Sequence, residues 1–119
     1  MENTFKQHLT DIIYKNKEGF TYTLELKPTN FKRGYFVALT NNSHKNINKA
    51  IQNLLKLKED YKQISKNLFI GGWLSDDNTY FLDLSLRFEN RKDALIMGKL
   101  QKQQSIFNIK NKNCIEVLN

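Results

Sequence analysis

The order of apolar and polar residues along the chain predicts helices that alternate with pairs of strands. An apolar stripe with the three- and four-residue spacing of a helix comes first. It consists of Phe5, Leu9, Ile12 and Ile13. Thr4 and Gln7 have the spacing of a capping box, so we expect them at the start of this helix.

The first pair of strands follows this helix. Residues 20–26 alternate strictly between apolar and polar side chains, which is typical of a strand with one buried face. Pro28 ends this strand, because proline has no amide hydrogen to donate to a ladder. Gly34 opens the next apolar run, Tyr35 to Leu39, which predicts the returning strand.

A long helix is predicted after Ser43. At 100° per residue, its apolar positions fall on one side. They are Ile47, Ala50, Ile51, Leu54, Leu57, Tyr61 and Ile64. A basic line on the opposite side consists of Lys45, Lys49 and Lys56.

Residues 68–74 and 79–88 predict a second pair of strands, joined by a polar turn at 75–78. We expect a bulge at Gly71 and Gly72, with Trp73 packed beside it. Alternation in the second strand predicts two faces. One carries Tyr80, Leu82, Leu84 and Leu86, and the other carries Phe81, Asp83, Ser85 and Arg87.

The last helix is expected to begin after Asn90, with Asp93 favoured by the helix dipole. Ala94, Met97 and Gly98 mark its tightly packed side, and short strands at 106–109 and 114–118 close the chain. The predicted order is α-β-β-α-β-β-α-β, with room for one more strand. This order predicts an α+β fold in which helices pack on a mostly antiparallel sheet.

Length and composition are those of one globular domain, residues 1–119, with 39% hydrophobic and 26% charged residues. The net charge of +7 attracts polyanions such as nucleic acid, an acidic protein face or a ribonucleoprotein. An AT-rich genome, whose codons favour Lys, Asn and Ile, is the alternative explanation for this charge.

The single cysteine, Cys114, excludes an internal disulfide and fits a reducing compartment. The first residues lack the apolar core of a signal peptide, and no apolar run approaches the roughly 20 residues of a membrane span. We therefore expect a cytoplasmic protein.

Catalytic and metal-binding signatures are missing from the sequence, so we expect neither an enzyme nor a cofactor. The histidines, His8 and His44, are far apart, and there is no pair of cysteines. Glu25 and Lys27 have the spacing used by metal-dependent nucleases, but the further acid that such a site needs does not come from another strand. Asp83 and Ser85 lack a histidine partner for acyl transfer.

Residues 33–39 partly match the core sequence of an RNA-recognition motif. In that motif the two aromatic residues share one face, whereas Tyr35 and Phe36 are neighbours and point to opposite faces. We therefore reject the match. The loop before this strand carries Phe31, Lys32 and Arg33, and Phe31 there either anchors a partner or plugs the core.

The C-terminal third resembles a small domain of bacteriophage proteins. The similar stretches are 69–73, 76–78, 80–85, 91–95 and 104–109. The family pattern is G-G-W, an acidic turn, Y-x-D-x-S, a D-x-x-E-A helix start and Q-x-A-x-[FW]-D. Ser105 replaces the alanine and Asn108 the closing aspartate, while Lys92 and Asp93 shift the helix acids. The resemblance implies no enzymatic activity.

Size, charge and resemblance together predict a phage or mobile-element accessory protein that binds a host macromolecule in the cytoplasm of a bacterial cell. One form would be an anti-CRISPR-like inhibitor that binds a host defence protein or ribonucleoprotein. The alternative is a basic accessory protein that binds nucleic acid directly, and a nuclease is the third. The residues expected to bind the partner are Phe31, Lys32, Arg33, Lys45, Lys49 and Lys56.

Overall fold

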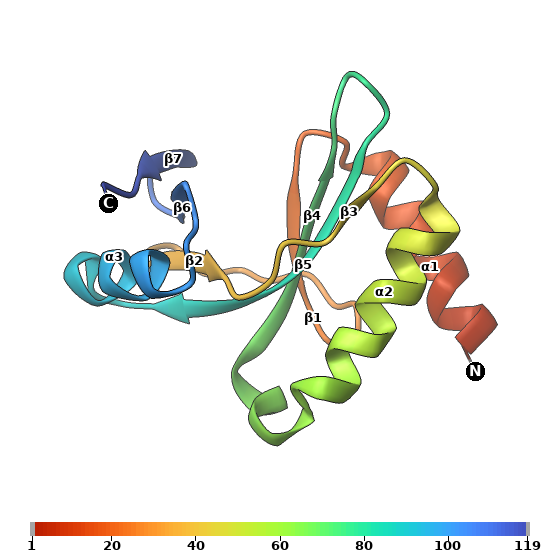
Figure 1. Ribbon diagram of the computed structural model, residues 1–119, viewed down its shortest axis with the longest axis horizontal. Helices are drawn as coiled ribbons and strands as arrows, with labels where there is room; N and C mark the ends of the chain where they lie inside the picture. Colours follow the sequence, from red (N-terminus) through yellow and green to blue (C-terminus); the bar gives the residue numbers. More distant parts are fainter. Residues whose placement is uncertain (1, 119) are drawn as a thin grey trace.

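The computed structural model describes residues 2–118, and three α-helices pack there on a single antiparallel sheet (Figure 1). The helices are α1 (Glu2–Lys15), α2 (Ile47–Asp60), α3 (Arg91–Leu100) and the 3₁₀ segment η1 (Lys62–Asn67). The strands are β1 (Phe20–Thr23), β2 (Tyr35–Ala38), β3 (Ser43–His44), β4 (Leu68–Leu74), β5 (Tyr80–Phe88), β6 (Ser105–Asn108) and β7 (Asn113–Glu116). The predicted α+β class is confirmed.

Strand β5 is the long central strand of this sheet. The order across the sheet is β1-β4-β5-β2-β6-β7, and β3 also pairs with β5. Strands β2 and β3 lie along the same edge of β5, at opposite ends of it. The segment between β2 and β3 also remains hydrogen-bonded to β5. The Leu39 amide donates to the Leu84 carbonyl, and the Leu82 amide donates to the Asn42 carbonyl. Figure 1 shows β5 joining the α1–α2 end of the molecule to the α3 end.

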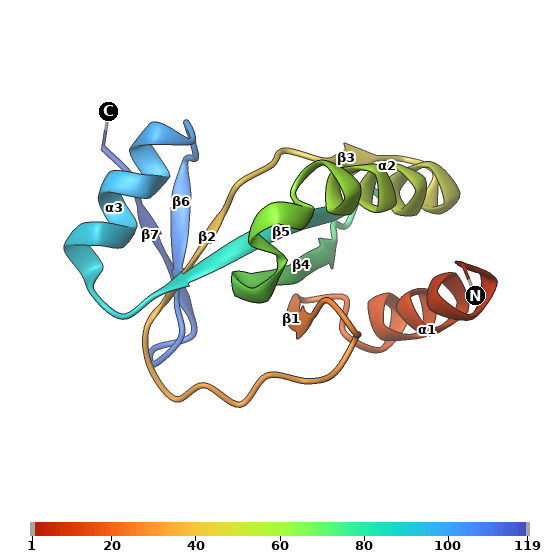
Figure 2. The same cartoon turned by 90° about the horizontal axis from the view of Figure 1, so that it is seen from below.

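All three helices cover the same face of the sheet. In β5 the alternate residues Leu82, Leu84, Leu86 and Phe88 point to this face. The first part packs under α1 and α2, in a core that includes Leu9, Ile13, Ile51 and Leu54. The second part packs under α3, in a smaller core of Val37, Ala94, Ile106 and Val117. Figure 2 shows α2 and α3 on one side of β5 and the β1–β2 connection on the other.

Polar caps fix where α2 and α3 begin. The side chain of Asn46 accepts a hydrogen bond from the Lys49 amide, which satisfies one of the free donors at the start of α2. Asn90 does the same for the amides of Lys92 and Asp93, as predicted. Asp93 also lies in the first turn of α3, where its charge favours the helix dipole.

The structure corrects three element boundaries. Helix α1 already begins at Glu2, so Thr4 and Gln7 lie inside it and form no capping box. Helix α2 ends at Asp60, and Ile64 is exposed in η1 rather than packed on the core. Strand β1 ends at Thr23, because a tight turn with Leu26 at a φ of 63° brings Pro28 back beside Tyr22.

The predicted bulge at Gly71 and Gly72 is wrong. The pairing of β4 with β5 runs without interruption from Leu68 opposite Leu86 to Leu74 opposite Tyr80. Gly72 is needed for a different reason, since a Cβ there would lie 2.6 Å from the carbonyl oxygen of Phe81. The glycine therefore permits close approach of backbone and side chains rather than an extra residue.

Within residues 2–118, no helix combines the length and apolar character needed to cross a lipid bilayer.

Candidate partner-binding face of the sheet

The face of the sheet opposite the helices, here called the open face, carries an unusual number of aromatic side chains. Strand register places Phe36, Phe69, Trp73, Phe81 and Phe107 there. The exposed fractions of Trp73 and Phe107 are 46% and 36%. Exposed aromatic rings are enriched at sites that bind other macromolecules, so this face is the candidate functional site.

Phe31 lies over one part of the open face. Its ring packs edge-on against Phe36 and Phe69, with centroids 6.2 and 5.5 Å away. Phe36 is buried beneath this cluster, whereas Phe31 remains 39% exposed. One part of the Phe31 ring therefore closes the aromatic cluster, and the other part is exposed.

Arg87 holds the Phe31 loop on the sheet. Its guanidinium lies 4.2 Å from the centroid of the Phe31 ring. Its Nη2 donates to the Arg33 carbonyl oxygen at 2.5 Å, and its Nη1 donates to Glu89 at 2.6 Å. The Arg87 side chain is mostly buried and keeps its Nε without a partner among the described residues. A mostly buried, multiply bonded guanidinium fixes the loop more firmly than an exposed ion pair would.

Glu89 completes this arrangement at the surface. It also lies 3.6 Å from Nε of Arg33, and both of these side chains are exposed. Hydrogen bonding and charge from Arg87 hold the pKa of the Glu89 carboxyl below its usual value.

Trp73 and Phe81 form a second aromatic group on the open face. The two residues are cross-strand partners in β4 and β5. Their rings are stacked, with centroids 4.4 Å apart and planes 6° apart. The partner ring and the strand pairing hold the half-exposed indole in place, so little side-chain entropy remains to be lost on binding.

Asp83 lies between these aromatic groups along β5. Its carboxylate accepts hydrogen bonds from the Thr40 hydroxyl at 2.6 Å and from the Asn42 amide at 2.7 Å. Burial raises the pKa of Asp83, and the two hydrogen bonds oppose that rise. The contacts tie Asp83 to the segment between β2 and β3, which indicates a structural role for this carboxylate.

The residues predicted to bind a partner lie on two different sides of the molecule. Phe31, Lys32 and Arg33 belong to the loop at the open face, and all three are exposed. Lys45, Lys49 and Lys56 are exposed on or beside α2, which covers the opposite face. Nζ of Lys45 also lies 3.1 Å from the Asp77 carboxylate, so part of its charge is compensated.

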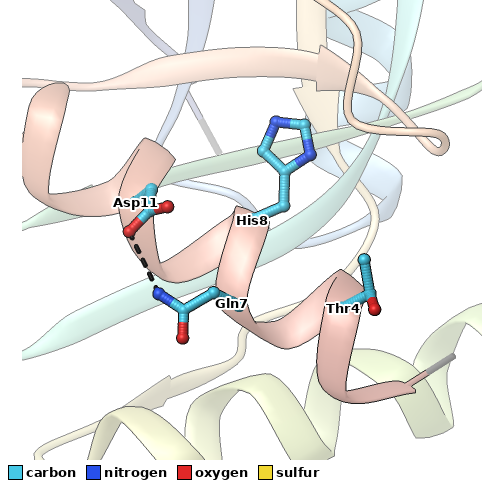
Figure 3. Close-up of a pocket in the computed structure, with 4 residues that line it drawn as sticks. All are labelled: Thr4, Gln7, His8 and Asp11. Carbon is cyan, nitrogen blue, oxygen red and sulfur yellow. Dashed lines mark hydrogen bonds between the residues drawn. The ribbon is translucent and has the colours of Figure 1, made fainter.

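The exposed side of α1 has a shallow hollow lined by Thr4, Gln7, His8 and Asp11 (Figure 3). Gln7 donates a hydrogen bond to Asp11 at 3.3 Å, whereas the His8 ring points away from this pair. All four lining side chains come from one helix. This arrangement lacks the convergent polar groups of a ligand site.

Metal and nuclease chemistry gain no support from the geometry. Among the described residues, no three His, Cys, Asp or Glu side chains gather closely enough to hold a metal ion. Glu25 and Lys27 lie in the turn after β1 rather than on a strand, so the strand context expected of a nuclease pair is missing. The rejected RNA motif also fails as expected, because Tyr35 packs under α3 while Phe36 faces the opposite side.

Comparisons with protein-family profiles, with curated proteins and with solved structures found no match for this chain. The resemblance to phage proteins therefore stays a prediction.

The Trp73–Phe81 stack was not predicted from the sequence. Phe81 had already been placed on the same face as Asp83, Ser85 and Arg87. The predicted four-residue turn at 75–78 would pair position 74 with 79 and therefore 73 with 80, whereas the structure pairs 74 with 80 and 73 with 81. Ser75 donates its amide to the Thr79 carbonyl, so the turn proper is 76–78, and the run of polar residues does not fix this length.

Proposed function

We propose that this protein acts by binding a protein surface through its open face. The observation that carries the proposal is a helix-free sheet face with the rigid Trp73–Phe81 stack at one place and Phe31 at another. Aromatic and arginine side chains dominate the energetic centres of protein interfaces, and lysine and glutamate are depleted there. The open face has this composition.

Charge favours a protein partner over bare nucleic acid at this face. Binding to a phosphate backbone requires cations along the groove or sheet. On β4 and β5 Arg87 is the single cation within the described residues, and Glu89 and the Arg33 carbonyl already engage it. The exposed cations Lys32 and Arg33 are confined to the adjoining loop, and Arg33 faces Glu89. The basic line on α2 lies on the other side of the molecule.

The resemblance of the C-terminal third to phage proteins supports a narrower version of this proposal. In that version the protein is a phage or mobile-element accessory protein, and its target is a host macromolecule in the bacterial cytoplasm. A host defence nucleoprotein is one class of target, and the protein would inhibit it as an anti-CRISPR-like protein does. The proposal includes no catalytic step and no cofactor.

Affinity capture from bacterial lysate tests the proposal with two matched variants. Trp73→Ala combined with Phe31→Ala removes both aromatic anchors, whereas Lys45→Gln, Lys49→Gln and Lys56→Gln remove the basic line. We expect the aromatic variant to lose the captured protein, since each anchor contributes about 2 kcal/mol. The lysine variant should retain it and mainly associate more slowly.

Nucleic-acid binding is the outcome that would replace this proposal. Labelled single- and double-stranded DNA and RNA are titrated at two salt concentrations. We expect weak binding at physiological salt. Tight binding whose affinity falls steeply with salt, and which the lysine variant loses, would instead assign the protein to nucleic acid. Nuclease treatment of the lysate before capture separates direct protein contacts from contacts bridged by nucleic acid.

A further inference from the structure

A second surface, on the helix-covered side of the sheet, lies where α3 meets β7. Helix α3 and the segment 115–118 line a shallow groove of about 630 Å³. Figure 2 shows α3 beside β6 and β7, at the end of the molecule away from α1 and α2. The walls of the groove are apolar, with Leu95 and Ile96 from α3 facing Ile115 and Val117. Ile96 is 50% exposed and Leu118 is 79% exposed.

The groove opens beside an unpaired strand edge. Within residues 2–118, strand β7 ends the sheet and pairs with β6 alone. The Val117 amide donates to Gln104, so Ile115 and Val117 direct their backbone groups towards β6. The backbone amides and carbonyls of Cys114 and Glu116 then point outwards from the sheet. These groups form a ready template for one more strand.

The opposite edge of the sheet does not offer the same template. There the chain itself returns after β1, and Pro28 forms a bridge with Tyr22. The carbonyl of Lys27 also accepts a hydrogen bond from the Thr23 amide. This return covers the outer side of β1 and leaves β7 as the open edge.

Positive charge is concentrated around this groove. Residues 90–118 contain six Lys or Arg against two Asp or Glu, a net +4 of the chain's +7. Arg91, Lys92 and Lys99 form the rim against one lining carboxylate, Glu116, and all four are exposed. None of the six cations makes a salt bridge within residues 2–118. An occupant with negative charge would complement this rim, and apolar side chains would fill the walls.

We propose that the α3–β7 groove binds an extended, acidic segment of a partner protein, which adds to β7 as an antiparallel or parallel strand. Alternate side chains of the added strand would lie on the helix side, against Leu95, Ile96 and Ile115. Its acidic residues would face Arg91, Lys92 and Lys99. The apolar walls favour a polypeptide over nucleic acid, since a sugar-phosphate backbone gains nothing from them. This proposal is independent of the open face.

Selection from a displayed library of random 12-residue peptides tests the proposal, with the full chain as bait. We expect enriched peptides that alternate apolar residues and carry Asp or Glu. A synthetic copy of the best peptide should shift amide NMR signals at 91–99 and 113–118. Failure to enrich such peptides, or shifts confined to the open face, would overturn the proposal.

Variants identify the contacts. Lys92→Glu combined with Lys99→Glu should lower the affinity for the peptide by about tenfold or more, because attraction between the charges becomes repulsion. Lys49→Glu combined with Lys56→Glu, two exposed changes on α2 with the same total change of charge, is the matched control and should leave the affinity unchanged. Equal losses in both would show that net charge alone drives binding. Circular dichroism of each variant separates lost binding from lost folding.

Peptide backbone methylation tests strand addition directly. N-methylation at the residues whose amides face β7 should abolish binding, and methylation at the alternate residues should be tolerated. If both methylated peptides bind equally, the peptide does not add to the sheet. Competition with labelled single-stranded DNA and RNA covers the remaining alternative. Displacement by either at stoichiometric concentration, with a steep dependence on salt, would assign the groove to nucleic acid.

Discussion

The indole of Trp73 lies flat on the ring of Phe81, across the two central strands and on the face that no helix covers. Trp73 is the single tryptophan of the chain, so its fluorescence reports on the open face alone. A half-exposed indole is accessible to a soluble quencher such as acrylamide. We predict that binding of the open-face partner protects Trp73 from quenching and shifts its emission to shorter wavelength.

The same fluorescence experiment distinguishes the two binding surfaces. A peptide bound in the α3–β7 groove should leave Trp73 emission and quenching unchanged, because the groove is built from residues 91–99 and 115–118. A partner that engages the open face should change both. Equal protection by both ligands would contradict the assignment of separate surfaces.

Gly72 and Gly71 provide a matched pair of substitutions in β4. We predict that Gly72→Ala lowers the free energy of unfolding by about 2–3 kcal/mol, because overpacking strains the strand pair. The new Cβ would meet the Phe81 carbonyl oxygen at 2.6 Å and the Phe20 ring at 2.8 Å. Chemical denaturation with linear extrapolation measures this change.

Gly71→Ala is the control for that prediction. A Cβ at Gly71 would have its nearest contact at 3.5 Å, on the Ser85 hydroxyl, which is ordinary packing. We expect stability within about 0.5 kcal/mol of the original protein. The reverse order, with Gly71→Ala the more harmful change, would show that the register of β4 is displaced.

Asp83 predicts a pH dependence of stability with a defined sign. Because burial raises its pKa in the folded protein, the native state binds a proton more tightly there than the unfolded chain does. The contribution of Asp83 to the free energy of unfolding therefore falls as the pH rises from about 4 to the native pKa of this carboxyl. Above that pH the contribution stays at its lowest value. Asp83→Asn removes this titration and keeps an oxygen that accepts from Thr40 and Asn42.

The measurement is the difference in unfolding free energy between the two proteins at pH 4 and pH 7. We predict that the variant gains stability relative to the original protein as the pH rises. Asp77 and Glu89, whose pKa values are lowered by hydrogen bonds, contribute the opposite slope but are present in both proteins. A difference that does not change with pH would contradict the burial of Asp83.

Local patterns predicted the two faces of β5 and the start of α3, but not the way distant segments meet. The alternation in β5 correctly separated Leu82 and Leu84 from Phe81 and Arg87, and Asn90 correctly marked the start of α3. These features depend on neighbours within a few residues. Periodicity carries no information on where a loop packs, so the contact of Phe31 with Phe69 was not predictable.

The predicted binding residues lie on two different sides of the molecule for the same reason. Helix periodicity correctly placed Lys49 and Lys56 away from the apolar stripe of α2, whereas Lys45 precedes the helix. The sequence did not show that the Phe31 loop crosses the other face of the sheet. Only the pairing of β2 between β5 and β6 fixes that side, through contacts of more than 40 residues' separation.

The attachment of the Phe31 loop yields the last prediction. Arg87→Lys keeps the charge but loses the planar fork that joins the Arg33 carbonyl, Glu89 and the Phe31 ring. A single ammonium cannot make these contacts together. We predict that hydrogen exchange becomes faster by about tenfold at the loop amides of residues 29–34, which corresponds to about 1.4 kcal/mol of lost loop stability. Exchange in α1 and α2 should not change.

Arg91→Lys is the matched control, because Arg91 is exposed on α3 and makes no contact with the loop among the interactions of the described residues. It should leave loop exchange unchanged. If the open face binds its partner through Phe31, Arg87→Lys should also lower the affinity for that partner. Quenching of Trp73 in the free protein should stay the same. Unchanged loop exchange in Arg87→Lys would mean that the Phe31–Phe36–Phe69 packing alone holds the loop, and that the guanidinium contributes nothing to its position.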